Sequence, residues 1–209
     1  MCYNILLLIK LRKEKMLNNI ITKRKSIRDF DKGELDEEII ISSFEAARRA
    51  PSAFNEQPWR FILAERSNTE EFNSMLDILF EKNREWSQNA SLLVIVLSKR
   101  TLSRNDNLNK HYLYDTASAV ANLTFQANSL DLYVHQMGGF DTRKVINNYS
   151  VPEDYEPAVV LAIGRKTISD INSNETLNEI KRLPLEDILF ENKFGESHSI
   201  LINQNLMNN

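Results

Sequence analysis

The chain has 209 residues, 42% of them hydrophobic and 26% charged, with a formal net charge of −3. This length and composition predict one domain with a substantial core, and the acidic balance disfavours a nucleic-acid partner. With one cysteine, three histidines that lack metal-ligand spacing and no long apolar run, we expect a metal-free, disulfide-free cytoplasmic protein that does not span a membrane and that binds small molecules.

The N-terminal stretch does not resemble a signal peptide. An apolar run at residues 5–9 precedes the positive charges of residues 10–15, whereas a signal peptide carries its charges first. Met16 stands directly before a helical pattern at residues 17–25. We therefore expect Met16 to be the native start, residues 1–16 to be an extension, residues 17–196 to form the domain and residues 197–209 to be a flexible tail.

A basic segment follows the first predicted helix. It contains Arg24, Lys25 and Arg28, with Ser26 between them. Guanidinium groups and a hydroxyl suit a phosphate monoester because they offer charge-assisted, geometrically matched hydrogen bonds. The alternative is a solvated basic turn.

A proline-bounded loop comes after the next predicted helix, which Asp36 caps and which runs to Arg49. The loop, residues 50–59, reads APSAFNEQPW. Its prolines interrupt regular structure at both ends, and its polar side chains are Ser52, Asn55 and Gln57. A rigid polar loop suits a planar ligand rich in heteroatoms, although an ordinary helix-to-strand turn has the same composition.

The middle of the chain predicts alternating strands and helices. We expect a strand at residues 61–64, a helix that begins with a capping box at Ser67–Glu70 and buries Phe72, Met75, Leu76 and Leu79, and a strand buried on both faces at residues 92–97. The longest helical pattern, residues 112–130, has an alanine-rich face that lets another helix approach closely. A second buried strand, residues 157–163, ends at Gly164.

Residues 133–141 read YVHQMGGFD and end a predicted strand. The paired glycines Gly138 and Gly139 permit close backbone approach and unusual dihedral angles. Nearby His135 is a candidate general acid, but a histidine at a strand end is more often structural.

Arg24–Ser26 and Pro51–Trp59, in this order and at this separation, are similar to two segments of the nitroreductase family of FMN-dependent flavoproteins, and the Gly138–Gly139 segment is similar to a third. The resemblance covers roughly residues 17–196. It implies an α+β fold with a central, mostly antiparallel sheet wrapped by helices. It also implies a homodimer with FMN at the subunit interface, which the long helix helps to build.

The resemblance implies a role for each site residue. Arg24, Lys25 and Ser26 would hold the FMN phosphate and ribityl chain, Arg28 would lie near flavin N1 and O2, and the backbone of Gly138 and Gly139 would lie near N5. The partner subunit would supply the loop residues Pro51, Ser52, Ala53 and Asn55, with Gln57 in the same loop. Asn83 falls loosely where some relatives contact the ring.

Three further residues bear on the resemblance to the family. Lys181 and Arg182 resemble a basic element that closes over the phosphate, and a charge pair at a helix end is an equal alternative. Asp131 stands where relatives commonly have glycine, which predicts a different end for the preceding helix.

The implied activity is a ping-pong transfer of hydride from NAD(P)H through flavin N5 to a nitroaromatic, a quinone or a similar electrophile. No catalytic side chain is required, because the flavin performs the chemistry. The alternatives are dehalogenation, enone reduction or flavin fragmentation on the same scaffold, or a flavin-binding dimer without turnover.

Overall fold

The computed structural model describes residues 16–167, 182–196 and 198–200. The chain divides into two compact units, one of residues 20–173 and one of residues 1–19 and 174–209. Within the described residues of the latter, the short 3₁₀ helix η2 spans Leu185–Asp187. The predicted extension and tail lie almost wholly outside the described residues. The described residues contain no helix of the length and hydropathy that a membrane span needs.

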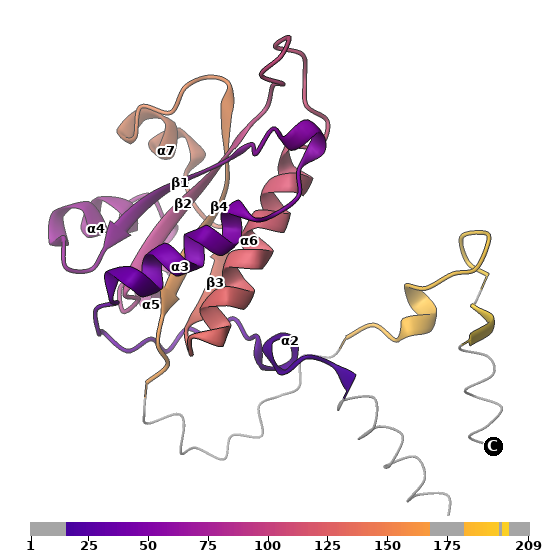
Figure 1. The fold of residues 1–209 in the computed structure, drawn as a ribbon. Coiled ribbons are helices and arrows are strands. Elements are labelled where there is room, and N and C mark those ends of the chain that lie inside the picture. Colours follow the sequence, from indigo (N-terminus) through magenta and orange to yellow (C-terminus); the bar gives the residue numbers. More distant parts are fainter. Residues whose placement is uncertain (1–15, 168–181, 197, 201–209) are drawn as a thin grey trace, which may run out of the picture. The chain divides into compact units, whose positions relative to one another are not determined.

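The larger unit is built on one antiparallel sheet. Its four strands are ordered β1-β2-β4-β3, and each neighbouring pair is antiparallel (Figure 1). The strands are β1 (Trp59–Glu65), β2 (Leu92–Lys99), β3 (Tyr133–Met137) and β4 (Tyr155–Gly164). The predicted strands and the α+β class are confirmed.

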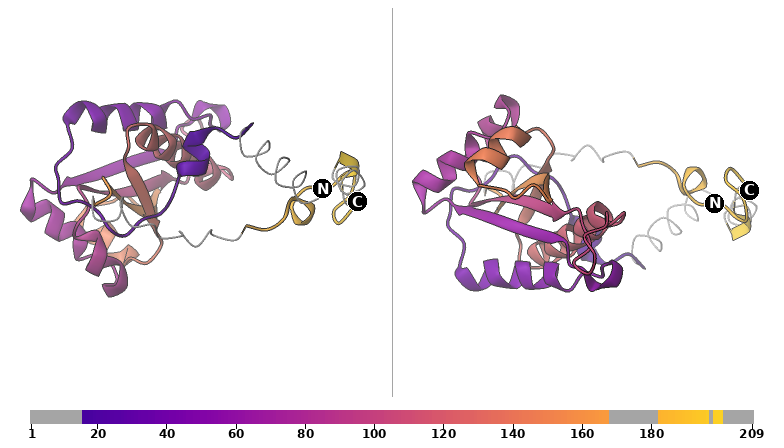
Figure 2. Two further views of the ribbon diagram at one scale, coloured as in Figure 1. Left: turned by 90° about the horizontal axis from the view of Figure 1, so that it is seen from below. Right: turned by 90° about the horizontal axis from the view of Figure 1, so that it is seen from above.

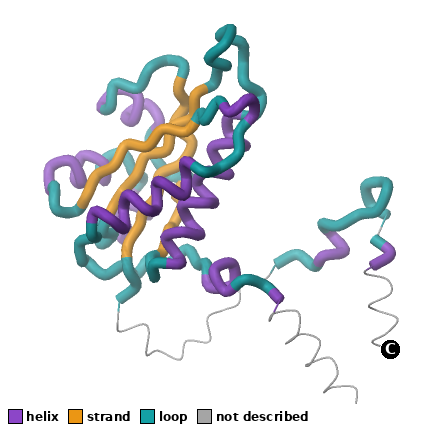
Figure 3. Tube along the Cα trace, in the orientation of Figure 1, coloured by secondary structure: helices purple, strands orange, loops and turns teal. Residues whose placement is uncertain are grey.

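Strand β2 is buried on both faces, so the sheet needs a cover on each side. Leu92, Val94 and Val96 face a core that they share with the helices α3 (Glu37–Arg48) and α6 (Tyr112–Ser129). Leu93 and Ile95 face the opposite core. That core includes residues of α4 (Thr69–Leu76), α5 (Glu81–Ser87) and α7 (Thr142–Asn148). Figures 2 and 3 show the helices on both faces of the sheet.

The start of α4 differs from the prediction by one residue. Its N-cap is Asn68, whose side chain accepts a hydrogen bond from the Glu71 N–H at 3.4 Å. The predicted box from Ser67 to Glu70 is therefore wrong, because the side chain that accepts a free N–H of the first turn belongs to Asn68 and not to Ser67. Leu79 is buried as predicted but lies beyond α4, in a bridge with Phe140.

The helix α3 begins where predicted, although its cap works differently. Asp36 occupies the N-cap position in an extended conformation, but its side chain makes no capping hydrogen bond. The first-turn residues Glu37 and Glu38 still favour this end through the helix dipole. The position of the helix start is confirmed.

Helix α6 ends in a left-handed turn at Asp131, which has φ 57°. The Leu132 N–H bonds to the Ala127 carbonyl at 2.9 Å, and the Asp131 N–H bonds to the Asn128 carbonyl at 3.3 Å. This is the C-terminal motif that glycine usually completes. The predicted change of helix end is therefore not found, since Asp131 adopts the conformation that glycine favours.

We expect Asp131→Gly to stabilise the protein by about 0.5–1 kcal/mol, because glycine adopts a positive φ without a Cβ penalty. Ala117→Gly is the matched control. Ala117 is exposed and lies within the same helix, away from its ends, so this substitution should destabilise the protein by about 1 kcal/mol. Urea unfolding of the three proteins measures both effects. Equal destabilisation by both substitutions would contradict the assignment of strain to Asp131.

Candidate functional site

The basic arm, residues 24–28, carries three cations, Arg24, Lys25 and Arg28, and the hydroxyl of Ser26. The Arg24 guanidinium lies 3.5 Å from Ser26 Oγ, to which it donates. Among the described residues, Arg24, Lys25 and Arg28 make no ion pair with an acidic side chain. Adjacent positive charges repel one another. An anion bound between them would offset this repulsion and stabilise the segment.

The arm is held against the sheet by the residues that follow it. Phe30 is 2% exposed and forms a bridge with Lys166 just beyond β4. The Asp31 N–H donates to the Arg165 carbonyl at 2.9 Å. The arm therefore ends at a fixed point beside the C-terminal end of β4.

The glycine turn after β3 meets Asn83, which the sequence placed only loosely. The Asn83 Nδ2 donates to the Gly139 carbonyl at 3.0 Å, and the Phe80 N–H donates to the same oxygen at 3.2 Å. A Cβ on Gly139 would lie 2.7 Å from Asn83 Nδ2, whereas a Cβ on Gly138 would meet nothing within 4 Å. The Asn83 side chain therefore packs against the backbone at Gly139, where a Cβ would collide with it, and neither glycine has a positive φ.

His135 has a structural hydrogen bond. Its Nδ1 lies 2.7 Å from the Ile27 carbonyl oxygen. A carbonyl can only accept, so Nδ1 carries the proton and donates it to this bond. Burial lowers the pKa of His135, the hydrogen bond to Ile27 opposes this, and the Arg28 charge lowers it further. The structural interpretation therefore accounts for His135 without a catalytic role.

The proline loop, residues 51–57, is tied to α6 through a carboxylate that the sequence analysis missed. Asp115 is 4% exposed, and its Oδ2 accepts the Ala53 N–H at 2.9 Å. The sequence feature that could have identified Asp115 is an acidic residue among the apolar positions of the long helix. Ser52 Oγ accepts the Gln57 N–H at 3.0 Å and closes the loop internally.

The loop also contains backbone strain. Phe54, Asn55 and Gln57 have φ values of 53°, 58° and 47°. Non-glycine residues rarely adopt this region, and such strain persists only where surrounding contacts impose it. The rigid polar loop that the prolines predicted is therefore present.

The arm and the proline loop do not meet within one chain. They adjoin opposite edge strands, β3 and β1, which lie roughly 14 Å apart across the sheet. Through β2, Trp59 is level with Glu156 of β4, whereas His135 pairs with Ala162, roughly 20 Å further along the strand. Figure 1 places the loop and the helix α5 at opposite ends of the sheet.

The C-terminal basic pair is only half within the described residues. Lys181 lies outside the described residues. Arg182 belongs to the unit that contains residues 174–209, and it is exposed. Its role with the phosphate stays a prediction.

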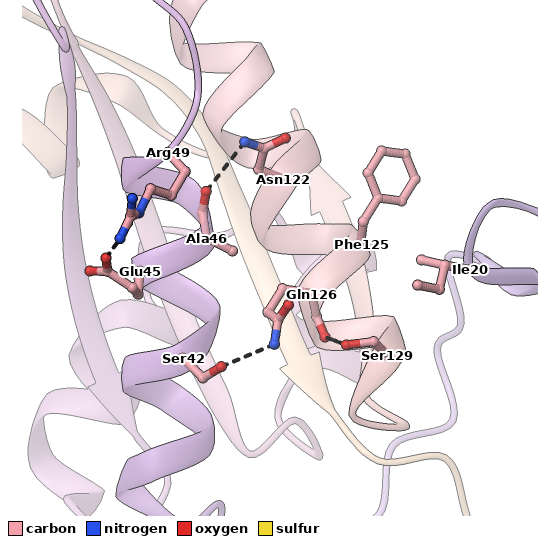
Figure 4. A pocket seen from close by; sticks show the side chains of 9 residues that line it. All are labelled: Ile20, Ser42, Glu45, Ala46, Arg49, Asn122, Phe125, Gln126 and Ser129. Carbon is pink, nitrogen blue, oxygen red and sulfur yellow. Dashed lines mark hydrogen bonds and ion pairs between the residues drawn. The ribbon is translucent and has the colours of Figure 1, made fainter. Parts of the chain in front are cut away.

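A groove of about 480 Å³ runs between α3 and α6 (Figure 4). Gln126 Nε2 donates to Ser42 Oγ at 3.0 Å and Asn122 Nδ2 to the Ala46 carbonyl at 3.3 Å, which joins the two helices along it. Ile20 and Phe125 supply its apolar side. The residues that line the groove include none of those predicted to bind flavin.

The sequence profile of the Nitroreductase family matches residues 21–165. This range includes the basic arm, the proline loop, Asn83 and the glycine turn. The chain belongs to the nitroreductase family. The family resemblance predicted from the arm and loop motifs is confirmed.

Three curated proteins are similar to parts of the chain. An uncharacterised 15.4 kDa protein of Mycolicibacterium smegmatis is 25% identical over 65% of this chain and 97% of its own length. A Methanothermobacter thermautotrophicus protein, provisionally named NADH dehydrogenase/NAD(P)H nitroreductase, is 27% identical over 69% of this chain and 74% of its own. Iodotyrosine deiodinase of Thermotoga neapolitana is 45% identical, but over only 24% of this chain and 27% of that enzyme.

Solved structures of the nitroreductase family have the same fold. A structure described as an oxidoreductase containing FMN has a TM-score of 0.78 and 29% identity, and the alignment covers 87% of this chain and 94% of that one. A nitroreductase of Exiguobacterium sibiricum in complex with FMN has a TM-score of 0.68 and 20% identity, over 82% and 95% of the two chains. The second likeness concerns the fold alone.

In this nitroreductase-family chain, we expect Gly139→Ala to destabilise by about 1–3 kcal/mol, because the new Cβ displaces the Asn83 amide. Gly138→Ala is the matched control and should be close to neutral, since its Cβ meets open space. Thermal unfolding measures both. In an Asn83→Ala background the cost of Gly139→Ala should shrink, and an unchanged cost would show that Asn83 is not the obstacle.

Stability should depend on pH through His135. The unfolded histidine takes up a proton near its ordinary pKa of 6.5, while the folded one does so only at lower pH. Between these two pKa values the unfolded state therefore binds more protons than the folded state. The contribution of His135 to the free energy of unfolding is fully present above pH 6.5 and is lost as the pH falls through the folded pKa.

Urea unfolding at several pH values between about 5 and 8 tests this dependence. His135→Asn keeps a donor at the Nδ1 position, does not titrate and should flatten the profile in this window. A profile that persists in His135→Asn would assign the effect to another group.

Proposed function

We propose that the protein is an FMN-dependent oxidoreductase that takes hydride from NAD(P)H and delivers it to a nitroaromatic, a quinone or a similar electrophile. The observation that carries this proposal is the basic arm, whose three cations have no acidic partner among the described residues, within a nitroreductase-family fold. The FMN in the two solved structures described above supports the choice of ligand.

The donor set of the arm fits the phosphate of FMN. The guanidinium of Arg24 and the hydroxyl of Ser26 already lie together, and both can donate to phosphate oxygens, with Lys25 beside them. Arg28 would face the pyrimidine edge of the ring. A fixed positive charge there stabilises negative charge that develops on that edge.

The proline loop would supply the other side of the site. Asn55 keeps its side-chain amide exposed at a strained turn, where it can donate to and accept from a heterocycle. The Ala53 N–H is committed to Asp115, so Ala53 would contact the ligand through other atoms. FMN, when bound, supplies the two-electron chemistry, and the protein holds it and leaves one face open.

A second copy of the chain would complete the site. The arm and the loop lie at opposite edges of the sheet, so a symmetric pair can place the arm of one copy against the loop of the other. Apolar side chains on α3 and α6 are available for this contact. Ile41 is 59% exposed and Tyr114 is 76% exposed, and both belong to the layer that carries the groove of Figure 4.

The chain does not need a catalytic acid for this chemistry. His135, the one candidate acid, uses its Nδ1 proton to hold the Ile27 carbonyl. Protons for the acceptor can come from solvent at the open face. The work of the side chains is therefore binding, orientation and electrostatic tuning.

An anaerobic visible spectrum tests the function directly. We expect NADH or NADPH to bleach a bound flavin band and a nitroaromatic or quinone to restore it. A flavin band that neither nicotinamide bleaches would leave the flavin-binding dimer as the better description. Protein that cannot be reconstituted with FMN would overturn both.

We expect Arg24→Ala to weaken FMN retention at least tenfold, because a charge-assisted phosphate contact contributes about 1.5–3 kcal/mol. The flavin content after gel filtration measures it. A loop variant with Ser52→Ala and Asn55→Gly should also lose FMN, while glycine still permits the positive φ at position 55.

Mixing the two defective proteins tests the two-chain site. Random pairing of the arm variant with the loop variant should restore about a quarter of the wild-type flavin, because each mixed dimer contains one intact site. A mixture of Arg24→Ala and Arg28→Ala proteins is the matched control and should restore none. Equal failure of both mixtures would show that the arm and the loop do not share a site across two chains.

Reductive dehalogenation is the second candidate. The local similarity to iodotyrosine deiodinase favours it, although the match covers 27% of that enzyme. In this reaction the reduced flavin supplies two electrons, a proton replaces iodine on the ring and iodide leaves. Anaerobic incubation of the reduced protein with iodotyrosine, followed by measurement of iodide, decides between the candidates.

A further inference from the structure

Trp86 of α5 lies at the centre of a cluster that joins three segments of the chain. Its ring centroid is 4.4 Å from that of His135 on β3 and 6.1 Å from that of Phe30, which follows the arm. The guanidinium carbon of Arg28 lies 5.9 Å from the Trp86 centroid. Trp86 was not predicted from the sequence, because its partners are distant in the chain.

The contact between Arg28 and Trp86 has the geometry of a cation–π interaction. An arginine over an indole face is attracted by the negative potential of the ring, and tryptophan gives the strongest such attraction. Arg28 is exposed and has no acidic partner among the described residues. The indole is therefore the contact that restricts where this guanidinium points.

His135 acts on the same arm through the backbone. Its ring packs on Trp86, and its Nδ1–H donates to the carbonyl of Ile27, the residue before Arg28. The side chain and the backbone at the end of the arm are thus held by two neighbouring rings. Both rings belong to residues of regular elements, β3 and α5, whose backbones fix where the rings lie.

Core packing alone does not account for an indole at this place. Trp86 Nε1 is buried and makes no hydrogen bond to the described chain. A buried donor without a partner is unfavourable, and phenylalanine or leucine would fill space here without that cost. The wide aromatic face is the property that tryptophan adds.

We infer that Trp86 and His135 are positioning residues for the flavin, which fix Arg28 and the basic arm before FMN binds. This inference rests on the proposed function. A long, flexible arginine loses much of its rotamer freedom on binding, and a guanidinium already held on a ring loses less. The same contact sets the distance between the Arg28 charge and the flavin edge, so it also influences the flavin midpoint potential.

The experiment is a double-mutant cycle on the full-length protein with FMN as the probe. Trp86→Leu should raise the Kd for FMN about tenfold and shift the midpoint potential to more negative values, because the cation is no longer held at the anionic edge. In an Arg28→Met background, Trp86→Leu should have little further effect on either quantity. Trp86→Phe keeps an aromatic face and should restore the Kd to within about threefold of wild type.

His135 provides a second pair of variants should the leucine at position 86 unfold the protein. His135→Leu removes the donor to Ile27 and should weaken FMN binding, whereas His135→Asn retains a donor and should bind FMN nearly as wild type does. Thermal unfolding of the FMN-free proteins reports any loss of folding separately from the Kd.

The outcomes separate the inference from the function on which it rests. If Trp86→Leu weakens FMN equally with and without Arg28, or leaves the Kd and the potential unchanged, Trp86 is a packing residue and the inference is wrong. If the wild-type protein binds no FMN, the proposed function fails and the inference fails with it.

Discussion

Burial of β2 on both faces is the constraint on which the rest of the structure depends. A strand without a solvent-facing side requires a helical layer above and below and a paired strand on each edge. The pairings with β1 and β4 provide the edges, and the layers α3–α6 and α4–α5–α7 provide the covers. Polar ligand-binding groups are then confined to the sheet edges and to the loops beyond the strands.

That confinement explains why the candidate site is divided. The arm and the glycine turn adjoin β3, and the proline loop precedes β1 at the other edge. Each half is rigid by its own means. His135 and Phe30 fix the arm, and Asp115 fixes the loop. A second copy offers the simplest way to bring two rigid, separated halves to one ligand.

The sequence was sufficient for features that depend on local patterns. The run Leu92–Leu97 predicted a strand buried on both faces, and the long helix begins at Tyr112 as expected. Side-chain caps were less predictable, since Asn68 rather than Ser67 meets the free N–H of α4. Backbone dihedrals were less predictable still, because Asp131 adopts a conformation that its type seldom chooses.

Features that depend on contacts between distant segments were not predicted. Asn83 was only loosely assigned, and the reason that position 139 must be glycine is the Asn83 amide itself. Asp115 and Trp86 were missed altogether, because their partners Ala53 and Arg28 lie more than fifty residues away in the chain. Motif spacing predicted residues that would touch a ligand, but it did not predict the residues that hold them in place.

The charge distribution supports an anion site more strongly than the net charge does. The chain is acidic overall, at −3, so carboxylates outnumber the cations that they could neutralise. Several of them are engaged elsewhere: Glu45 with Arg48 and Arg49, Asp77 with Arg84, and Asp154 with Lys99. In the part of the chain that the structure describes, the cations of the arm stay unpaired despite this surplus. Their mutual repulsion is unfavourable, and a bound phosphate would remove it.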